Sequence, residues 1–369
     1  MSGLTEPVLA RPAHFCGTFA PVDVVMLLKP AHIAHVAIEE KERLIQSGAK
    51  HYSEMLSAEK VPDARYLQLY HEALARNAGR LKRDIETLAG KIAARPQTAT
   101  QCVIISLARA GTPIGVLLKR CLERSGVTTF HYTVSIIRGR GIDLNALRHI
   151  AQRHGTATSV FLDGWTGKGA ISGELQTSLA RADIGFAPFL AVVADPAGCA
   201  SLAATVDDYV IPSGLLNGIV SGLISRTVLT EDLVGPSDFH ACLFQADHGP
   251  HDLTRHFLDS VWTAAADGAS SPWSLTEAGR ARTASQAILR ELMDKYAVGD
   301  VNRIKPGIAE ATRALLRRVP DRVFIRDAAD PETLHMQHLA ATSAVPVVER
   351  DLGGYRAVTI IKRLKGEQE

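Results

Sequence analysis

A loop of the size that holds a phosphate stands in the middle of the chain, in the stretch VFLDGWTGKGAISGE. Asp163 ends an apolar run, and the loop continues with Thr166, Gly167, Lys168 and Gly169. Glycines let backbone N–H groups approach an anion, a helix N-terminus adds about half a positive charge, and Lys168 adds a full charge. The pattern predicts a strand, an anion-binding loop and a helix. An ordinary βα turn, with glycines that serve only the turn, has the same pattern.

Two further loops carry cations and also follow apolar runs. CVIISL leads into Ala108, Arg109, Ala110 and Gly111, and HYTVSII leads into the turn that holds Arg138 and Arg140. Because the carboxyl ends of parallel strands meet at one edge of a sheet, we expect all three loops to converge there. A carboxylate accepts hydrogen bonds from vicinal hydroxyls, while arginines and N–H groups bind phosphates, so this edge fits a sugar with phosphates at two ends. Each arginine, taken alone, fits a solvated loop residue equally well.

Alternating strands and helices must position these loops. Helical periodicity over 63–92 predicts one long helix with a basic outer face. Apolar runs predict strands at 102–107, 131–137, 160–162, 188–194 and 209–211. Helical segments lie between the first four runs, so we expect an α/β fold with a parallel sheet that is covered on both faces.

A smaller α/β domain is expected at the C-terminal end. The stretch AAADGASSP is small and polar and opens the clearest linker in the chain. Beyond it, amphipathic helices alternate with apolar runs at 322–326, 345–348 and 357–361. The predicted division is a first domain at 1–263, which includes a helical N-terminal extension at 30–95, then a linker at 264–274 and a second domain at 275–369.

Composition excludes several classes of protein. The chain has 369 residues, a 46% hydrophobic fraction and a net charge of +2, so it is a packed protein without the overall charge of a nucleic-acid binder. It has neither a secretory leader pattern nor an apolar run of membrane-spanning length, and a cytoplasmic protein with no membrane partner is expected. Its cysteines form no zinc-type cluster, so we expect no metal held by protein ligands alone.

Cys16 follows His14 by two residues, which raises the question of a nucleophilic thiol and its base. On an extended segment, side chains two residues apart share a face at a spacing too wide for a hydrogen bond. A small packed cysteine is the preferred interpretation, and a nucleophile is the alternative. The apolar stretch 215–228 is typical of packed core or of a subunit contact, so a homodimer is a further expectation.

Several motifs together carry a family resemblance. FLDGWTGKG resembles the PRPP-binding motif of type I phosphoribosyltransferases, and ISLARAGTPIG resembles their pyrophosphate loop. With HYSEML, SIIRGRGID, DPAG and LLNGIVSGLISRTV, these motifs are similar to one bacterial family. That family is described both as phosphoribosyltransferase-like and as the cysteine protease StiP, and it is associated with tellurite-resistance and stress gene clusters. The likeness covers nearly the whole chain and implies a type I phosphoribosyltransferase-like sheet.

The resemblance also implies roles for individual residues. Asp163 would hold the ribose hydroxyls, 166–169 the 5-phosphate and 108–111 the diphosphate with Mg²⁺, and the candidate catalytic cations are Arg109, Arg138 and Arg140. The family motif has two adjacent acids, whereas Gly164 follows Asp163 here. The implied function is transfer or release of a base in the nucleoside-type metabolism of a tellurite or stress response. A non-catalytic phosphoribosyl- or RNA-binding regulator is one alternative, and a cysteine protease is the second.

The stretch IKPGIAEATRALLRR resembles the Pelota-type RNA-binding domain found in this family. The resemblance implies that structured RNA is a partner. The loop and helix that would face it contain Lys305, Gly307, Glu310, Arg313, Arg317 and Arg318. A glycine turn before a helix with several arginines is physically suited to backbone phosphates.

Overall fold

A six-stranded parallel sheet forms the centre of the protein, whose computed structural model describes residues 15–364. The strand order is β1-β4-β3-β7-β8-β9, and every neighbouring pair is parallel. The strands are β1 (Val25–Leu27), β3 (Gln101–Leu107), β4 (Thr128–Val134), β7 (Ser159–Trp165), β8 (Leu190–Ala194) and β9 (Leu202–Thr205). The predicted α/β fold with a parallel sheet is confirmed.

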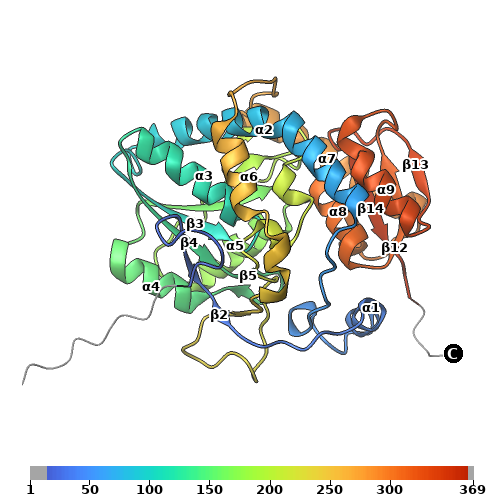
Figure 1. Ribbon diagram of the computed structural model, residues 1–369, viewed down its shortest axis with the longest axis horizontal. Helices are drawn as coiled ribbons and strands as arrows, with labels where there is room; N and C mark the ends of the chain where they lie inside the picture. Colours follow the sequence, from blue (N-terminus) through green and yellow to red (C-terminus); the bar gives the residue numbers. More distant parts are fainter. Residues whose placement is uncertain (1–14, 365–369) are drawn as a thin grey trace, which may run out of the picture.

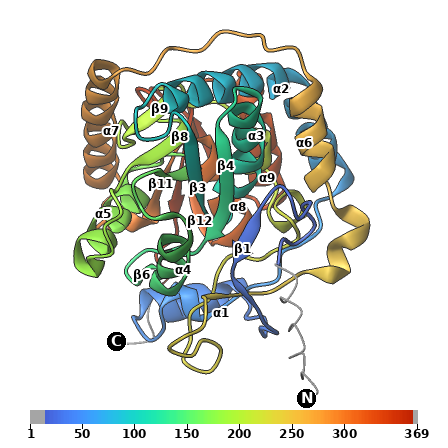
Figure 2. The ribbon, with the colours of Figure 1, turned by 90° about the vertical axis from the view of Figure 1, so that its left-hand side faces the viewer.

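Helices cover both faces of this sheet (Figures 1 and 2). One layer holds α2 (Ala64–Ala93), α3 (Gly111–Arg124) and α6 (Thr254–Thr263), and the other holds α4 (Leu144–His154) and α5 (Ala170–Ala182). Within β3, Ile104 packs into the first layer, while Val103 and Ile105 pack into the second. Because both faces of each central strand are buried, these strands are apolar at nearly every position.

The long helix α2 shows how local sequence signals set the scaffold. The Asp63 carboxylate caps it by accepting a hydrogen bond from the Tyr66 N–H at 2.8 Å. Its buried stripe includes Tyr70, Leu81 and Ile85, as the periodicity predicts. Before α2, the N-terminal extension contains α1 (Ile38–Gln46) and η1 (Tyr52–Glu54).

Several short strands and 3₁₀ turns lie outside the central sheet. β5 (Ile136–Ile137) and β6 (Gly141–Ile142) form an antiparallel hairpin, and β2 (Lys29–Pro30) pairs in parallel with β10 (Ala241–Cys242). The remaining 3₁₀ turns of this part are η2 (Pro212–Gly214), η3 (Gly218–Val220) and η4 (Ala246–His251). The residues described contain no helix that is long and apolar enough to cross a membrane.

A second sheet forms the smaller C-terminal unit, residues 275–364. Its order is β11-β14-β12-β13, and only β12 and β13 run parallel. The elements are α7 (Leu275–Lys295), η5 (Val301–Arg303), β11 (Ile304–Pro306), α8 (Ile308–Arg317), β12 (Pro320–Ile325), η6 (Pro331–Thr333), α9 (Leu334–Thr342), β13 (Val347–Glu349) and β14 (Ala357–Ile361). The predicted small α/β domain is confirmed.

The two units share a hydrophobic core. Ile308 and Leu315 of α8 and Met336 of α9 belong to the same buried cluster as α2 and α3. The segment 264–274 between the units runs along the outside of α2 (Figure 2), where Lys82 donates to the Ala264 carbonyl at 2.6 Å. This packing fixes α8 and β11 against the carboxyl edge of the parallel sheet.

The prediction of a strand at 209–211 is wrong. That segment is buried coil that leads into η2, and the edge strand is β9 at Leu202–Thr205. Tyr209, Val210 and Ile211 are apolar because they pack into the shared core, not because they pair in the sheet. An apolar run of three residues cannot distinguish these two cases.

Candidate functional site

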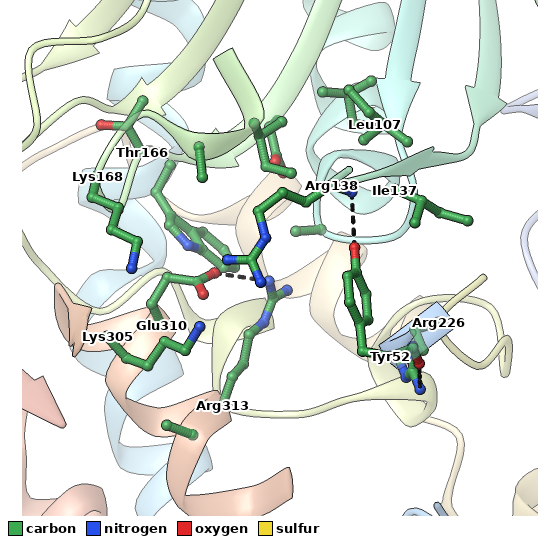
Figure 3. Close-up of a pocket in the computed structure, with 18 of the residues that line it drawn as sticks. Tyr52, Leu107, Ile137, Arg138, Thr166, Lys168, Arg226, Lys305, Glu310 and Arg313 are labelled. Carbon is green, nitrogen blue, oxygen red and sulfur yellow. Dashed lines mark hydrogen bonds and ion pairs between the residues drawn. The ribbon is translucent and has the colours of Figure 1, made fainter. Parts of the chain in front are cut away.

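A cavity of about 320 Å³ lies between the carboxyl edge of the parallel sheet and the C-terminal unit. The loop after β3, the β5–β6 hairpin and the loop after β7 form one side, and β11 and α8 form the other (Figure 3). The structure therefore brings the three loops chosen from the sequence to one place. It adds a wall from the C-terminal unit.

Asp163 lines the cavity near the end of β7. Burial raises the pKa of its carboxyl to about 7, although Arg313 and a hydrogen bond from the Gly164 N–H at 2.8 Å act in the opposite direction. At neutral pH this carboxyl exists in both protonation states, so it can exchange a proton or accept hydrogen bonds from a polyol. A Cβ at Gly164 would meet only the Ala110 carbonyl oxygen, at 3.8 Å. The backbone at this position therefore has room for the first atom of a side chain.

The predicted phosphate loop connects β7 to α5. Gly169 has φ +82° and directly precedes α5, so the helix N-terminus points at the loop. The Thr166 hydroxyl donates to Asp195 Oδ1 at 2.7 Å, and the Gly167 carbonyl accepts from the Tyr355 hydroxyl at 2.6 Å. The loop is thus held from β8 on one side and from the C-terminal unit on the other.

Lys168 points into the cavity (Figure 3). Its ammonium donates to the Ile304 carbonyl at 2.8 Å and to the Val301 carbonyl. Burial, with repulsion from Lys305 and Arg138, lowers its pKa to about 7. An anion in the cavity would favour the charged form.

Arg109 follows β3, as predicted, but its charge is already paired. Only 5% of the residue is exposed, and its guanidinium donates to both carboxylate oxygens of Glu59 and to the Ile224 carbonyl. Burial raises the pKa of Glu59, but Arg109 and Arg317 outweigh it and bring the value to about 2. The neighbouring loop residues Ala108, Ala110 and Gly111 line the cavity or start α3, and a Cβ at Gly111 would lie 2.3 Å from the Leu162 carbonyl oxygen.

The two arginines of the hairpin have different positions. Arg138 lines the cavity and bridges the units, because its guanidinium donates to Asn302 Oδ1 at 2.9 Å. Its backbone N–H donates to the Tyr52 hydroxyl at 2.8 Å. Arg140 pairs with Glu54 at 2.6 Å on the surface and does not line the cavity.

Five of the six residues chosen as the RNA-facing group line the cavity, and Gly307 does not. The five are Lys305, Glu310, Arg313, Arg317 and Arg318. Gly307 has φ +85° at the start of α8, where Asp208 accepts the Ile308 N–H at 3.0 Å. Burial lowers the pKa of Lys305 to about 8, and Arg313 ion-pairs with Glu310 at 3.4 Å while it stacks over Trp165.

Three lining residues were not selected as site residues from the sequence, although Tyr52 and Arg226 lie in the motifs HYSEML and LLNGIVSGLISRTV. Lys41 comes from α1, Tyr52 from η1 and Arg226 from the coil after η3. The Tyr52 ring lies beside two guanidinium groups, 5.8 Å from Arg138 and 5.5 Å from Arg226. These side chains come from segments that follow no strand of the central sheet, so no rule about strand ends could have selected them.

The five cysteines are not activated. Burial raises the pKa of each thiol, those of Cys16, Cys102, Cys121, Cys199 and Cys242. Cys16 Sγ donates to the Phe19 carbonyl at 3.3 Å, and in the part of the chain that the structure describes no thiol is hydrogen-bonded to a histidine ring. His14, the base considered for Cys16, lies outside the described residues.

The acidic residues of the cavity suit a metal ion that is bound jointly by the protein and by the phosphates of a substrate. Within residues 15–364, no three His, Cys, Asp or Glu side chains gather as a metal site. Mg²⁺ is commonly held by one or two carboxylates together with substrate phosphates and water. Asp163 is such a carboxylate, because it lines the cavity and none of the cationic side chains that the structure describes forms an ion pair with it.

Comparison with known proteins follows the same two units. The family model "Tellurite-like stress resistance cysteine protease StiP" matches residues 17–262. A protein of Acinetobacter baylyi named cysteine protease StiP is 40% identical over 375 residues, which cover 98% of this chain and 97% of that protein. The chain belongs to the StiP family. The PELOTA RNA binding domain matches residues 283–363, so the resemblances to the StiP family and to the Pelota-type domain are confirmed.

Solved structures resemble this StiP-family chain only weakly. The hypoxanthine phosphoribosyltransferase of Trypanosoma cruzi is 14% identical and matches 36% of this chain and 82% of its own, with a TM-score of 0.27. A hypothetical protein from Neisseria gonorrhoeae with bound ppGpp is 15% identical and matches 32% and 68%, with a TM-score of 0.23. Likeness at this level carries no argument about activity.

Proposed function

We propose that this StiP-family protein binds a phosphorylated ribose, PRPP or ribose 5-phosphate, in the cavity and acts on it as a phosphoribosyltransferase-like enzyme. The observation that carries the proposal is the surplus of positive charge in the cavity. Arg109 pairs with Glu59, Arg318 with Glu42 and Arg313 with Glu310. The cations that remain around the Asp163 carboxyl are Lys41, Arg138, Lys168, Arg226, Lys305 and Arg317. A polyanion with a polyol between its charges complements that arrangement.

Each part of such a ligand has a partner. The loop from Thr166 to Gly169, with Lys168 and the α5 N-terminus, suits the 5-phosphate, and Asp163 suits the ribose hydroxyls. When bound, Mg²⁺ would neutralise charge on a diphosphate. Transfer through a loose, oxocarbenium-like state depends on positioning and charge stabilisation, which need no nucleophilic side chain. The raised pKa of every thiol is therefore no obstacle to this chemistry.

The name of the Acinetobacter relative favours a second candidate, cysteine proteolysis. That reaction needs a thiolate, usually one paired with a histidine in a cleft. Cys16, the alternative nucleophile, is half-buried against the core, and burial raises its pKa. The cavity therefore supports phosphoribosyl chemistry better than it supports peptide cleavage.

Structured RNA is a further proposed partner, supported by the match to the PELOTA RNA binding domain. Lys305, Arg313 and Arg317 line the cavity, so RNA that contacts them would have to approach the cavity between the two units. A regulator that binds phosphoribosyl compounds without turnover remains the non-catalytic form of the proposal.

Thermal shift with Mg²⁺ and PRPP, and separately with ribose 5-phosphate, tests binding. Both ligands should raise the melting temperature of the wild type, and Asp163→Asn should reduce the shift with PRPP. Pyrophosphate release in the presence of candidate acceptors would distinguish an enzyme from a sensor. If neither ligand shifts the melting temperature, the phosphoribosyl proposal is wrong. Peptidase activity that disappears in a folded Cys16→Ser variant would support proteolysis instead.

A further inference from the structure

The cation chosen from the sequence for a diphosphate is not available for one. Arg109 forms a two-point ion pair with Glu59, and only 3% of its side chain is exposed. A buried pair of this kind is neutral as a unit, and separating it would leave a buried charge unpaired. The loop at 108–111 therefore offers backbone groups to an anion but little net charge.

Unneutralised cations lie next to that pair. Arg317, in the last turn of α8, reaches Glu59 Oε1 only at 3.9 Å, and its Nε and Nη2 have no hydrogen-bond partner among the described residues. Arg226 donates through Nη2 to the Tyr52 carbonyl at 2.6 Å, while its buried Nη1 has no partner in the same part of the chain. Glu59 thus neutralises Arg109 and lies only at the limit of an ion pair with Arg317, and within residues 15–364 no carboxylate forms an ion pair with Arg226.

Lys41 adds a third positive charge to this group. It is 5% exposed and lines the cavity. Burial, with repulsion from Arg226, Arg318 and Arg317, lowers its pKa to about 8, and all four side chains line the same cavity. Arg318 is excluded from the surplus because it pairs with Glu42 at 2.9 Å. We call Lys41, Arg226 and Arg317 the far cluster.

The far cluster and the phosphate loop lie at opposite ends of one cavity. Figure 3 shows Lys168 and Lys305 together at one end and Arg226 beside Tyr52 at the other, with Arg313 between them. Arg313 and Arg317 are four residues apart on α8, so they lie on one face with a rise of about 6 Å between them. Positive charge therefore continues from the phosphate loop past Asp163 to the far cluster.

Buried cations that lack counter-charges destabilise the folded state unless a bound anion neutralises them. The far cluster is adjacent to the loop at 108–111, since Arg109 lies close enough to repel both Arg317 and Arg226. A diphosphate held there would accept hydrogen bonds from backbone N–H groups of the loop and form ion pairs with the cations of the cluster. A 5-phosphate at Lys168 would leave the far cluster empty if the ligand carried no second anion.

Resting on the proposed phosphoribosyl function, we infer that the far cluster is the diphosphate subsite. Arg317 of the C-terminal unit, together with Lys41 and Arg226, binds the pyrophosphate group of PRPP. The C-terminal unit thus acts in small-molecule recognition and selects PRPP over ribose 5-phosphate. Arginine forks match the geometry of phosphate oxygens, which suits Arg317 to this role.

Calorimetric titration of the full chain with three probes tests the inference: Mg²⁺ with PRPP, inorganic pyrophosphate and ribose 5-phosphate. Arg317→Gln should weaken PRPP and pyrophosphate binding by about tenfold or more, the usual cost of losing a hydrogen bond to a charged group, while ribose 5-phosphate binding changes less than about twofold. Lys41→Gln should give the same pattern and does not depend on α8. Lys168→Gln should instead weaken ribose 5-phosphate and spare pyrophosphate.

Arg322→Gln is the matched control, since Arg322 lies in the same unit, pairs with Asp321 at 2.7 Å, lies over the Tyr296 ring and does not line the cavity. It should leave all three affinities unchanged. Unchanged PRPP affinity in folded Arg317→Gln and Lys41→Gln, with normal binding of ribose 5-phosphate, would overturn the inference and leave the proposed function intact. Equal losses of affinity for all three probes would also overturn the inference, because they would indicate that the cluster attracts any anion into the cavity. If the wild type binds none of the probes, the proposed function itself fails.

Discussion

Phosphate binding at the loop after β7 should take up protons from solution, and Lys168 should be their main acceptor. Burial, with repulsion from Lys305 and Arg138, lowers the pKa of the free Lys168 ammonium to about 7, and burial lowers that of Lys305 to about 8. A bound dianion restores the charged form of both. The folded protein without ligand therefore binds fewer of these protons than the complex does, and affinity falls as pH rises through this range.

The magnitude follows from those two values. At pH 8, charging Lys168 takes up about 0.9 proton and charging Lys305 about 0.5, so ribose 5-phosphate binding should take up about 1.4 protons. The ligand contributes none, because a phosphate ester with a second pKa of about 6 is already dianionic. Deprotonation of Lys168 alone should weaken the binding of ribose 5-phosphate about 50-fold between pH 7 and pH 9.

Calorimetry in two buffers with different ionisation enthalpies counts these protons directly. In Lys168→Met, which keeps the length of the apolar stem, uptake at pH 8 should fall to about 0.5. Lys91→Met is the matched control, since Lys91 also has a pKa lowered by burial and donates to two carbonyls, those of Ala203 and Trp273, but does not line the cavity. Equal proton uptake in the wild type and Lys168→Met would refute the reasoning.

Four further predictions rest on the same geometry. Gly164→Asp should fold normally, because a Cβ there meets only the Ala110 oxygen at 3.8 Å, and should bind Mg²⁺ with PRPP more tightly by calorimetry. Gly111→Ala, with a contact of 2.3 Å, should lose about 1–3 kcal/mol in chemical denaturation. Glu59→Gln removes the carboxylate that Arg109 and Arg317 share and should cost about 3–5 kcal/mol, part of which added pyrophosphate should restore. The raised pKa of Asp163 makes the ligand-free protein less stable as pH rises from about 4 to about 7. The melting temperature of Asp163→Asn should therefore exceed that of the wild type at pH 8 and equal it near pH 4. A difference in melting temperature that stays constant with pH would contradict this.

The fold and half of the cavity follow from local sequence signals. The loop after β7 is recognisable because Asp163, the glycines and Lys168 follow a buried apolar strand, and strand ends gather at one edge of a parallel sheet. The other half depends on contacts between distant segments. Nothing near Arg109 indicates that Glu59, fifty residues earlier, neutralises it. Likewise, the arginines of α8 are visible as a basic helix, but only the packing of the two units places them in the cavity.

The cavity described here also affects when the protein becomes functional during its synthesis. Its walls come from residues as far apart as Lys41 and Arg318, and Lys168 is held by carbonyls of Val301 and Ile304. Domains generally fold from the N-terminal end as the chain emerges, so the parallel sheet would form with its phosphate loop still open to water. A ligand that binds only the completed chain stabilises that chain and not its shorter precursors. The anion would therefore stabilise the protein only after both units have been synthesised and have packed together.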